Sequence, residues 1–258
     1  MCVPQTIRRL IPFTAFLVIV FFAFAAHSAT LSHSDYGVID HVDTKEKVIA
    51  LTFDADMTPK MLRELRDGNV SSWYNGDVVA ELDREKVPAT FFLTGMWIEA
   101  YPTTTRTLSN DSLFELGNHS YSHGGFGSSC WGLNRVKESQ DISEIKKTDV
   151  LLRTYATSYV RYFRFPELCQ DAEDARKAQG LGYTVIGGAI HGGDGFQKNA
   201  ARIVSNVVSH VKPGSIVVLH LHGGPDAPQT AVALPTIISE LRAKGYSFLK
   251  VSDLLKLK

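Results

Sequence analysis

Short apolar runs alternate with amphipathic stretches along most of this chain, and this alternation restricts its fold more than any other feature of the sequence. The runs predict buried strands at 47–53, 89–93, 114–119, 162–165, 183–187, 215–221 and 247–251. The amphipathic stretches predict helices at 76–86, 134–154, 172–179, 200–211 and 228–244. Alternating strands and helices indicate an α/β fold with a parallel sheet that the helices cover. About seven such units predict a distorted (β/α)7 barrel, incomplete and TIM-barrel-like, with a doubly wound open sheet as the alternative.

The long stretch 134–154 is expected to bury one face against the sheet. Its apolar residues Ile142, Ile145, Val150 and Leu151 are predicted to form that face, because apolar side chains of a surface helix gather on the side that packs on the core.

The N-terminus has the pattern of an export signal. Arg8 and Arg9 precede an apolar run at 10–26, and small residues follow it. We therefore expect residues 1–28 to be a signal peptide and the chain to be exported, either secreted or held at the cell surface. The alternative is an uncleaved membrane anchor formed by residues 10–26, since a run of about 17 residues is at the lower limit for a span. One domain is predicted over 45–258.

The charge balance gives no support for nucleic acid as a partner. Lys plus Arg and Asp plus Glu each number 27, so the formal net charge is zero, and no basic tail is present. In an oxidising compartment Cys130 and Cys169 would either pair or remain two separate small apolar residues. The sequence does not predict an oligomeric state.

Polar residues follow the ends of several predicted strands. They are Asp54 and Asp56, His119 and His123, Arg164 and Glu167, Asp194, and His220 and His222. The C-terminal ends of parallel strands meet at one face of a βα barrel, where such folds hold their active sites. Each residue also has a structural alternative: an aspartate after a strand is often a helix N-cap, the arginine could form a surface ion pair, and one histidine of the last pair could be a bystander.

His119 and His123 are predicted to bind a metal ion together. They are four positions apart, so on a helical start both imidazoles would lie on one face. Two histidines and one carboxylate, with open positions for water, are typical of a hydrolytic site for a divalent metal, in particular Zn²⁺. The ion acidifies its water, while a nearby carboxylate and a nearby histidine can act as base and acid.

Four motifs give the chain a resemblance to the polysaccharide deacetylases of carbohydrate esterase family 4. The first family motif is Thr-Phe-Asp-Asp-Gly, where this chain has TFDAD at 52–56. The second, His-Ser/Thr-x-x-His, is met in full at 119–123. The third is Arg-x-Pro-Tyr, here RFPE at 164–167, and another is a hydrophobic strand ending in Leu-x-His or Leu-Leu-His, here VVLH at 217–220. The resemblance extends over about 47–256.

The resemblance implies a role for each of these positions. Asp54 would be the catalytic base, Arg164 the residue that orients it, and His220 the acid. Ala55 occupies the position of the usual metal carboxylate, so Asp56 is the implied substitute and would bind the ion beside the two histidines of the second motif. The alternative is that Asp54 binds the ion and that the base is elsewhere.

Several positions depart from the family pattern or extend it. Glu167 replaces the tyrosine after Pro166, although the family uses the backbone N–H there as an oxyanion donor. Asp194 is the nearest candidate for holding the arginine of the third motif, and His222 is an additional histidine. Trp73 and Tyr74 could stack on sugar rings or pack in the core. The predicted substrate contacts are thus Trp73, Tyr74, Pro166, Glu167, Asp194 and His222.

The resulting hypothesis is a metal-dependent hydrolase that removes acetyl groups from N-acetylated or O-acetylated polysaccharide, such as chitin-like glycan or peptidoglycan. The alternative is a catalytically silent carbohydrate-binding module on the same fold, because three of the family motifs are altered.

Overall fold

The computed structural model describes Met1 and residues 36–127 and 134–258. The chain divides into a unit of residues 1–30 and a unit of residues 31–258, and the fold below is that of the second unit. The predicted signal and Cys130 lie outside the described residues, so export, anchoring and the cysteine pairing stay predictions. No helix among the described residues is both long and apolar enough to cross a membrane.

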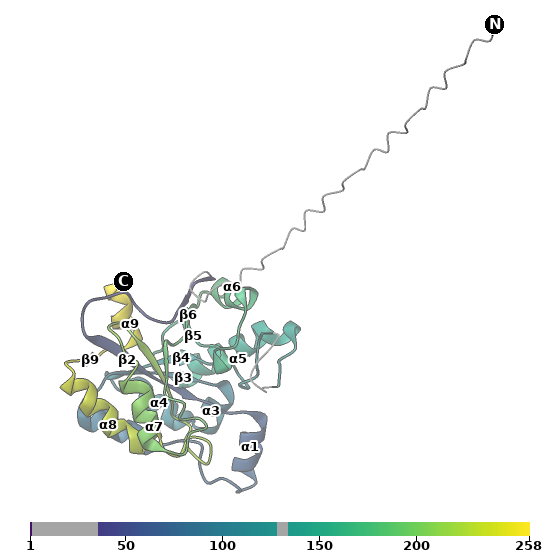
Figure 1. Ribbon diagram of the computed structural model, residues 1–258. Helices are drawn as coiled ribbons and strands as arrows, with labels where there is room; N and C mark the ends of the chain where they lie inside the picture. The colour runs from purple at the N-terminus through teal and green to yellow at the C-terminus, as the bar shows by residue number, and fades with distance from the viewer. Residues whose placement is uncertain (2–35, 128–133) are drawn as a thin grey trace. The chain divides into compact units, whose positions relative to one another are not determined.

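The centre of this unit is a curled sheet in which every ladder between strands is parallel (Figure 1). Its strands are β1 (Val38–Ile39), β2 (Val48–Ala55), β3 (Ala89–Leu93), β4 (Phe114–Asn118), β5 (Tyr162–Phe163), β6 (Thr184–Ile186), β7 (Ile190–His191), β8 (Ile216–His220) and β9 (Ser247–Phe248). The order is β1-β6-β5-β4-β3-β2-β8-β7, with β9 paired to the start of β2. Within the described residues no strand ladder joins β1 to β7, so the barrel is incomplete, as predicted. The seven predicted strands are present, and the two-residue strands β1 and β7 are additional.

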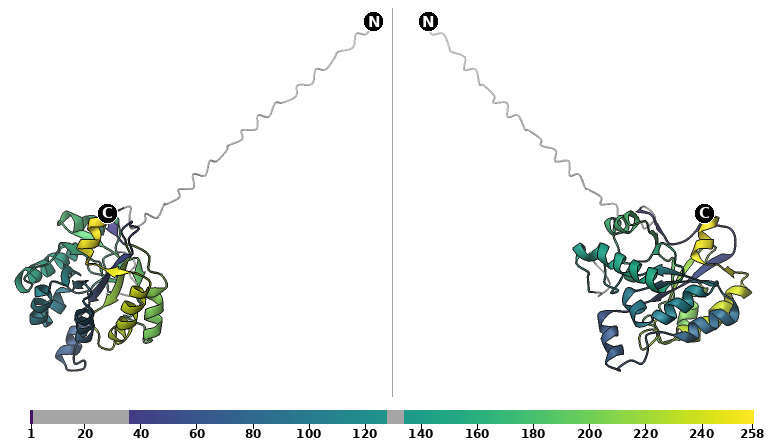
Figure 2. Two further views of the ribbon diagram at one scale, coloured as in Figure 1. Left: turned by 90° about the vertical axis from the view of Figure 1, so that its left-hand side faces the viewer. Right: turned by 180° about the vertical axis from the view of Figure 1, so that it is seen from behind.

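Helices cover the outer side of the sheet (Figure 2). They are α1 (Pro59–Arg66), α2 (Gly76–Glu85), α3 (Gly95–Ala100), α4 (Pro102–Asn110), α5 (Asp141–Tyr155), α6 (Ala172–Gly180), α7 (Ala200–Val208), α8 (Thr230–Ala243) and α9 (Val251–Leu254). The side chains of Thr58, Asp171 and Asn199 cap the starts of α1, α6 and α7. The short helices α1, α3 and α4 were not predicted from the sequence.

The two faces of the central strand β2 differ in chemistry. Ile49, Leu51, Phe53 and Ala55 pack into the apolar core between sheet and helices. The alternate residues face the inside of the curled sheet, because successive side chains of a strand point to opposite faces. The inside carries the polar residues Thr52 and Asp54 at its C-terminal end, and this is where the candidate site lies.

The predicted buried face of the long helix was partly wrong. Helix α5 begins at Asp141 rather than at residue 134, and the side chains of Ile142 and Val150 are 43% and 61% exposed. Ile145 and Leu152 are buried, together with the polar Glu144. The prediction from apolar residues alone failed because the buried side of α5 includes the polar Glu144, which accepts hydrogen bonds from a neighbouring loop.

Candidate active site

Asp54 and Asp56 enter the site from the end of β2. The alternation of the strand turns both carboxylates to the inside, while Ala55 between them is fully buried in the apolar core. In this chain a carboxylate at position 55 would point into that core, away from the histidines. The Asp-x-Asp spacing therefore suits two carboxylates that share one face.

His119 and His123 follow β4 on an irregular turn, not on a helical start, so that part of the prediction was wrong. The turn contains two residues in the left-handed region, Ser120 with φ +65° and His123 with φ +55°. Left-handed backbone at residues other than glycine is sparsely populated and persists where surrounding contacts determine it. The turn nevertheless brings the two imidazole rings to a centroid distance of 5.1 Å.

Glu144 holds this turn in place, a role that was not predicted from the sequence. Its carboxylate oxygen Oε2 accepts hydrogen bonds from the backbone N–H of Tyr121 at 3.1 Å and of Ser122 at 2.8 Å, and from the Ser122 hydroxyl at 2.9 Å. The side-chain oxygen of Asn118 accepts a further hydrogen bond from the backbone N–H of Ser120 at 2.9 Å. In the sequence, Glu144 could have been found as an acidic residue on the side of the helix that also carries buried apolar residues.

The donor atoms of Asp56, His119 and His123 converge on one point. Asp56 Oδ1 lies 3.4 Å from His119 Nε2 and 3.3 Å from His123 Nε2, and all three residues are buried. Their ligand atoms lie within 4.8 Å of one another, and among the residues that the structure describes they form the only such group of three. The structure thus places the predicted ligands together.

The hydrogen bonding of this triad fits a metal ion. Asp56 Oδ1 is buried without a hydrogen-bond partner within the described part of the chain. His119 Nδ1 lies 2.9 Å from the carbonyl oxygen of Arg164, which can only accept, so Nδ1 carries the proton and Nε2 is left with its lone pair. Burial opposes the ionised form of Asp56, but the neighbouring His123 outweighs it and holds the Asp56 pKa well below its usual value. An anionic oxygen beside a free imidazole nitrogen is a donor set suited to a divalent cation.

Asp54 is paired with a fully buried arginine. Arg164 Nη1 donates to Asp54 Oδ1 at 2.8 Å and to the Thr52 hydroxyl at 2.7 Å, and Nη2 donates to the Gly187 carbonyl at 2.8 Å. The guanidinium also lies 4.1 Å above the ring centre of Phe92. Asp54 Oδ2 lies 3.7 Å from His119 Nε2. The carboxylate therefore faces both Arg164 and the group of Asp56, His119 and His123, which we name the metal triad.

Asp194 holds His220 and not Arg164, which corrects the sequence analysis. Its Oδ1 lies 2.8 Å from His220 Nδ1, and its Oδ2 accepts from the His220 N–H at 2.8 Å and from the Thr230 hydroxyl at 2.6 Å. Burial alone would lower the His220 pKa, but the charge and hydrogen bond of Asp194 raise it to about 10. Asp194 is completely buried, so it cannot contact substrate as predicted.

His220 points its other ring nitrogen towards the metal triad. His220 Nε2 lies 3.8 Å from Asp56 Oδ2. The second histidine, His222, is 3% exposed, and its Nδ1 lies 3.4 Å from the same oxygen. Burial, reinforced by the nearby His220, lowers the His222 pKa to about 4, so this ring is neutral and packs against the metal carboxylate. Its predicted contact with substrate is therefore not supported.

The two aromatic residues predicted to stack on sugar have structural positions. Trp73 is 1% exposed, and its ring N–H donates to the Met61 carbonyl at 2.9 Å, so it packs in the core. Tyr74 is half-buried against Trp97 and Tyr101, at ring-centre distances of 5.9 and 6.2 Å.

A different aromatic residue stands at the mouth of the site. The side chain of Phe196 is 82% exposed and lines, with Glu167, two cavities of about 80 and 180 Å³ that reach Asp54, Asp56 and His220. Glu167 is exposed and has a φ of +53°, while Pro166 before it is buried. The signal for Phe196 was an aromatic residue within the Gly-rich loop around Asp194.

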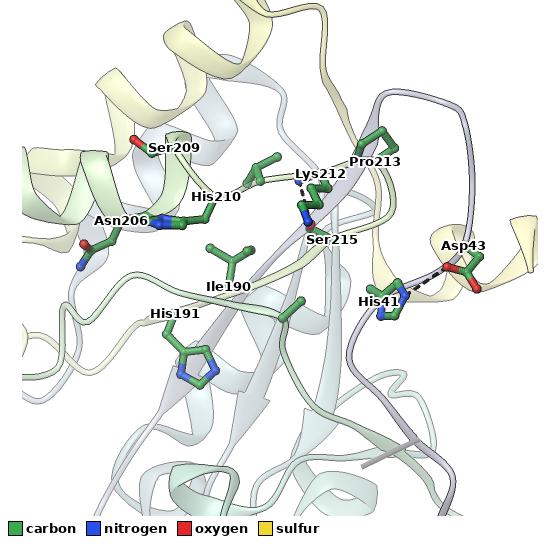
Figure 3. Close-up of a pocket in the computed structure, with 12 residues that line it drawn as sticks. His41, Asp43, Ile190, His191, Asn206, Ser209, His210, Lys212, Pro213 and Ser215 are labelled. Atoms are coloured by element: carbon green, nitrogen blue, oxygen red, sulfur yellow. Dashed lines mark hydrogen bonds and ion pairs between the residues drawn. The ribbon is translucent and has the colours of Figure 1, made fainter. Parts of the chain in front are cut away.

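A larger cavity of about 770 Å³ lies along β7 and the end of α7 (Figure 3). Its lining includes His41, His191, His210 and Lys212, and it shares His191 with the cavity that Asp54 and His220 line. Its histidines do not form part of a group of three metal-binding side chains within the described residues. Asp54 and Asp56 do not line it.

Comparison with known proteins agrees with this fold and geometry. Residues 41–186 match the family model described as polysaccharide deacetylase. A peptidoglycan-N-acetylglucosamine deacetylase of Bacillus cereus is 30% identical over 223 residues, which are 84% of this chain and 92% of that protein. The structure of a family 4 acetyl xylan esterase from Clostridium thermocellum with a cobalt ion has a TM-score of 0.64 at 26% identity, covering 82% of this chain and 91% of that one.

A second similar structure is that of a pseudoenzyme of carbohydrate esterase family 4 from Bacillus anthracis. Its TM-score is 0.69 at 22% identity over 86% of this chain and 70% of that one. At this identity the likeness concerns the fold alone.

The fold and the site together define a hydrolase of the deacetylase class. The chain belongs to the polysaccharide deacetylase family.

Proposed function

We propose that this protein uses a divalent metal ion, Zn²⁺, to remove acetyl groups from N-acetylated or O-acetylated polysaccharide such as peptidoglycan or chitin-like glycan. One observation carries the proposal. The metal triad, the Asp54–Arg164 pair and the His220–Asp194 pair meet at one mouth. There His119 Nε2 lies 3.7 Å from Oδ2 of the proposed base Asp54. Asp56 Oδ2 lies 3.8 Å from Nε2 of the proposed acid His220. The similarity to the Bacillus cereus peptidoglycan-N-acetylglucosamine deacetylase supports the choice of substrate.

Asp56, His119 and His123 would hold the ion. A Zn²⁺ ion supplies an acidified water and polarises the acetyl carbonyl. The chain contributes the preset tautomer of His119 through the Arg164 carbonyl, and the anionic state of Asp56.

Asp54 is the proton acceptor in this mechanism. Arg164 occupies Oδ1 of its carboxylate, which leaves Oδ2 directed at the triad, where the attacking water would lie. The buried guanidinium also fixes the orientation of the carboxylate, which a proton acceptor requires.

His220 is the proton donor to the departing sugar amine or hydroxyl. Asp194 holds Nδ1, so the proton available to the leaving group is the one on Nε2, the ring nitrogen that faces the triad. The raised His220 pKa keeps this proton in place at neutral pH.

The direct test is acetate release from acetylated chitooligosaccharide and from peptidoglycan, with and without a chelator. We expect turnover that the chelator abolishes and that added Zn²⁺ restores. Absence of acetate from every acetylated glycan, in protein shown to contain metal, would contradict the proposal.

The second candidate function is a silent glycan-binding module. The pseudoenzyme among the similar structures shows that this fold exists without activity. It predicts glycan binding that is unchanged by Asp54→Asn and no acetate release, so the same assay separates the two functions.

The Asp194→Asn variant tests whether His220 is the proton donor. In the Asp194→Asn variant the His220 pKa should fall, because burial then acts without the opposing charge. The protonated acid is present below its pKa, so the alkaline limb of the pH–kcat profile should move to lower pH. Asp226→Asn is the control, since Asp226 is exposed at the same mouth. An unchanged alkaline limb in Asp194→Asn would assign the proton transfer to another group.

Export of the chain through residues 1–28 is part of the proposal, with transient or anchored membrane association through residues 10–26 as its alternative. The N-terminal sequence of the mature protein distinguishes cleavage from anchoring.

A further inference from the structure

A second cavity, here named the cationic groove, opens beside the metal-binding turn. It has a volume of about 620 Å³. Its charged lining residues are Lys60, Arg63, Arg135, Lys137 and Glu144. Thr58 and His123 line both the groove and the cavity that holds Asp56 and His220. A chain of sugars bound at the catalytic cavity therefore has a direct path into the groove.

Positive charge in the groove is poorly compensated. Its one lining carboxylate, Glu144, is 7% exposed and is engaged by the backbone of the metal-binding turn. Lys60 lies 3.5 Å from Glu64 on the next turn of α1. For Arg63, Arg135 and Lys137, residues 36–127 and 134–258 provide no carboxylate at ion-pair distance. Since the whole chain has a formal net charge of zero, this concentration of cations is local.

The segments that carry the metal ligands also carry the groove. Asp56 leads through the cap Thr58 into α1, where Lys60 and Arg63 are three residues apart and so lie on one side of the helix. On the other wall, Gly125 pairs with Arg135, and the Arg135 Nε donates to the Phe126 carbonyl at 3.1 Å.

Gly124 allows the second wall of the groove, residues 134–136, to pack close to the turn that carries His123. A Cβ atom added at Gly124 would lie 2.4 Å from Val136 Cγ2 and 3.3 Å from the Asn134 carbonyl oxygen. The absence of a side chain lets the strand-like segment 134–136 pack directly against the residue that follows His123. The cations are thereby positioned next to the catalytic centre rather than elsewhere on the surface.

We infer that the cationic groove binds a carboxylate carried by the sugar unit next to the one that is deacetylated. Arginine side chains bind carboxylates in a forked geometry that neutral hydroxyls do not reproduce, and a neutral glycan would gain little from these charges. The substrate class is therefore an anionic acetylated glycan. The inference rests on the proposed function and adds the charge of the substrate to it.

The carboxylate could belong to the sugar itself or to a peptide attached to it, and substrates separate these sources. We would compare four substrates of equal length. These are a peptidoglycan tetrasaccharide with lactyl carboxylates and stem peptides, the same glycan without peptides, its carboxyl-reduced form, and the neutral N-acetylglucosamine tetramer. Wild type should prefer the carboxylate-bearing glycans, and added salt should weaken that preference.

The double variant Arg63→Gln, Arg135→Gln should lower the ratio of kcat/KM for anionic over neutral substrate by about five- to tenfold, the range expected for two partly exposed ion pairs. Arg202→Gln is the matched control, because Arg202 is an exposed arginine on α7 that does not line the groove. A ratio that falls only with the peptide-bearing glycan assigns the carboxylate to the peptide, and one that also falls with the peptide-free glycan assigns it to the sugar. An unchanged ratio in the double variant overturns the inference.

Failure of the proposed function is a separate result. If no substrate releases acetate, the same four glycans can be titrated against the wild type and the double variant by calorimetry. Tighter binding of the carboxylate-bearing glycans that the double variant loses would still support the groove. Equal affinities for carboxylate-bearing and carboxyl-reduced glycans would overturn it.

Discussion

Asp54→Asn is expected to lower kcat by a factor of about 10²–10⁴, the range that a positioned proton acceptor typically contributes. Asparagine keeps an oxygen that can accept from Arg164, but it cannot take a proton from water at neutral pH. Because Asp54 does not belong to the metal triad, the variant should bind metal as the wild type does. Acetate release and metal content, measured on the same preparation, check both parts.

This substitution also exposes a cost in stability. Arg164 is completely buried, so loss of its ion-pair partner leaves an uncompensated charge, an effect of about 3–5 kcal/mol in buried pairs. A thermal melt must therefore accompany the assay, and kcat is to be measured well below the midpoint. A folded, metal-loaded Asp54→Asn protein with more than a tenth of wild-type activity would remove Asp54 from the role of base.

Asp56→Ala is expected to remove the metal ion, with a loss of affinity of at least about 100-fold, since even an outer partner of a ligand typically contributes 10–100-fold. Asp56 is the anionic member of the triad, and its removal leaves His119 and His123 without a charged neighbour at 3.3–3.4 Å. Activity should fall with the metal. Metal analysis after dialysis against a metal buffer checks the prediction.

The neighbouring position provides a matched variant. Ala55 faces the apolar core and is fully buried, so a carboxylate placed there points away from the histidines. Adding Ala55→Asp to Asp56→Ala should not restore metal binding and should destabilise the fold, because an unpaired charge would be buried. Full metal occupancy in Asp56→Ala would instead leave Asp54 as the metal carboxylate.

The proposed base and the proposed acid have partners of opposite charge. Arg164 pairs with Asp54, whereas Asp194 pairs with His220 and raises its pKa to about 10. A protonated His220 at neutral pH is what the proposed proton donor requires. His222 between them stays neutral through burial and contributes no charge of its own.

The sequence by itself determined the parallel α/β architecture and that the polar residues after several strands gather at one site. Apolar runs of strand length predict buried strands, and the C-terminal ends of parallel strands meet at one face, so Asp54, His119, Arg164 and His220 had to lie near one another. The period of two along β2 explains in addition why Asp56, and not Ala55, lies beside the histidines.

Only the tertiary structure decided which of these residues contact one another. The bond from Asp194 to His220, the burial of Trp73 and the support of the histidine turn by Glu144 join residues that are 26, 12 and 22–23 positions from their partners. No local pattern encodes such pairs, because a loop conformation and the packing of a helix on the sheet select them. The cationic groove has the same origin, since its two walls come from α1 and from the segment that Gly124 allows to pack against the metal-binding turn.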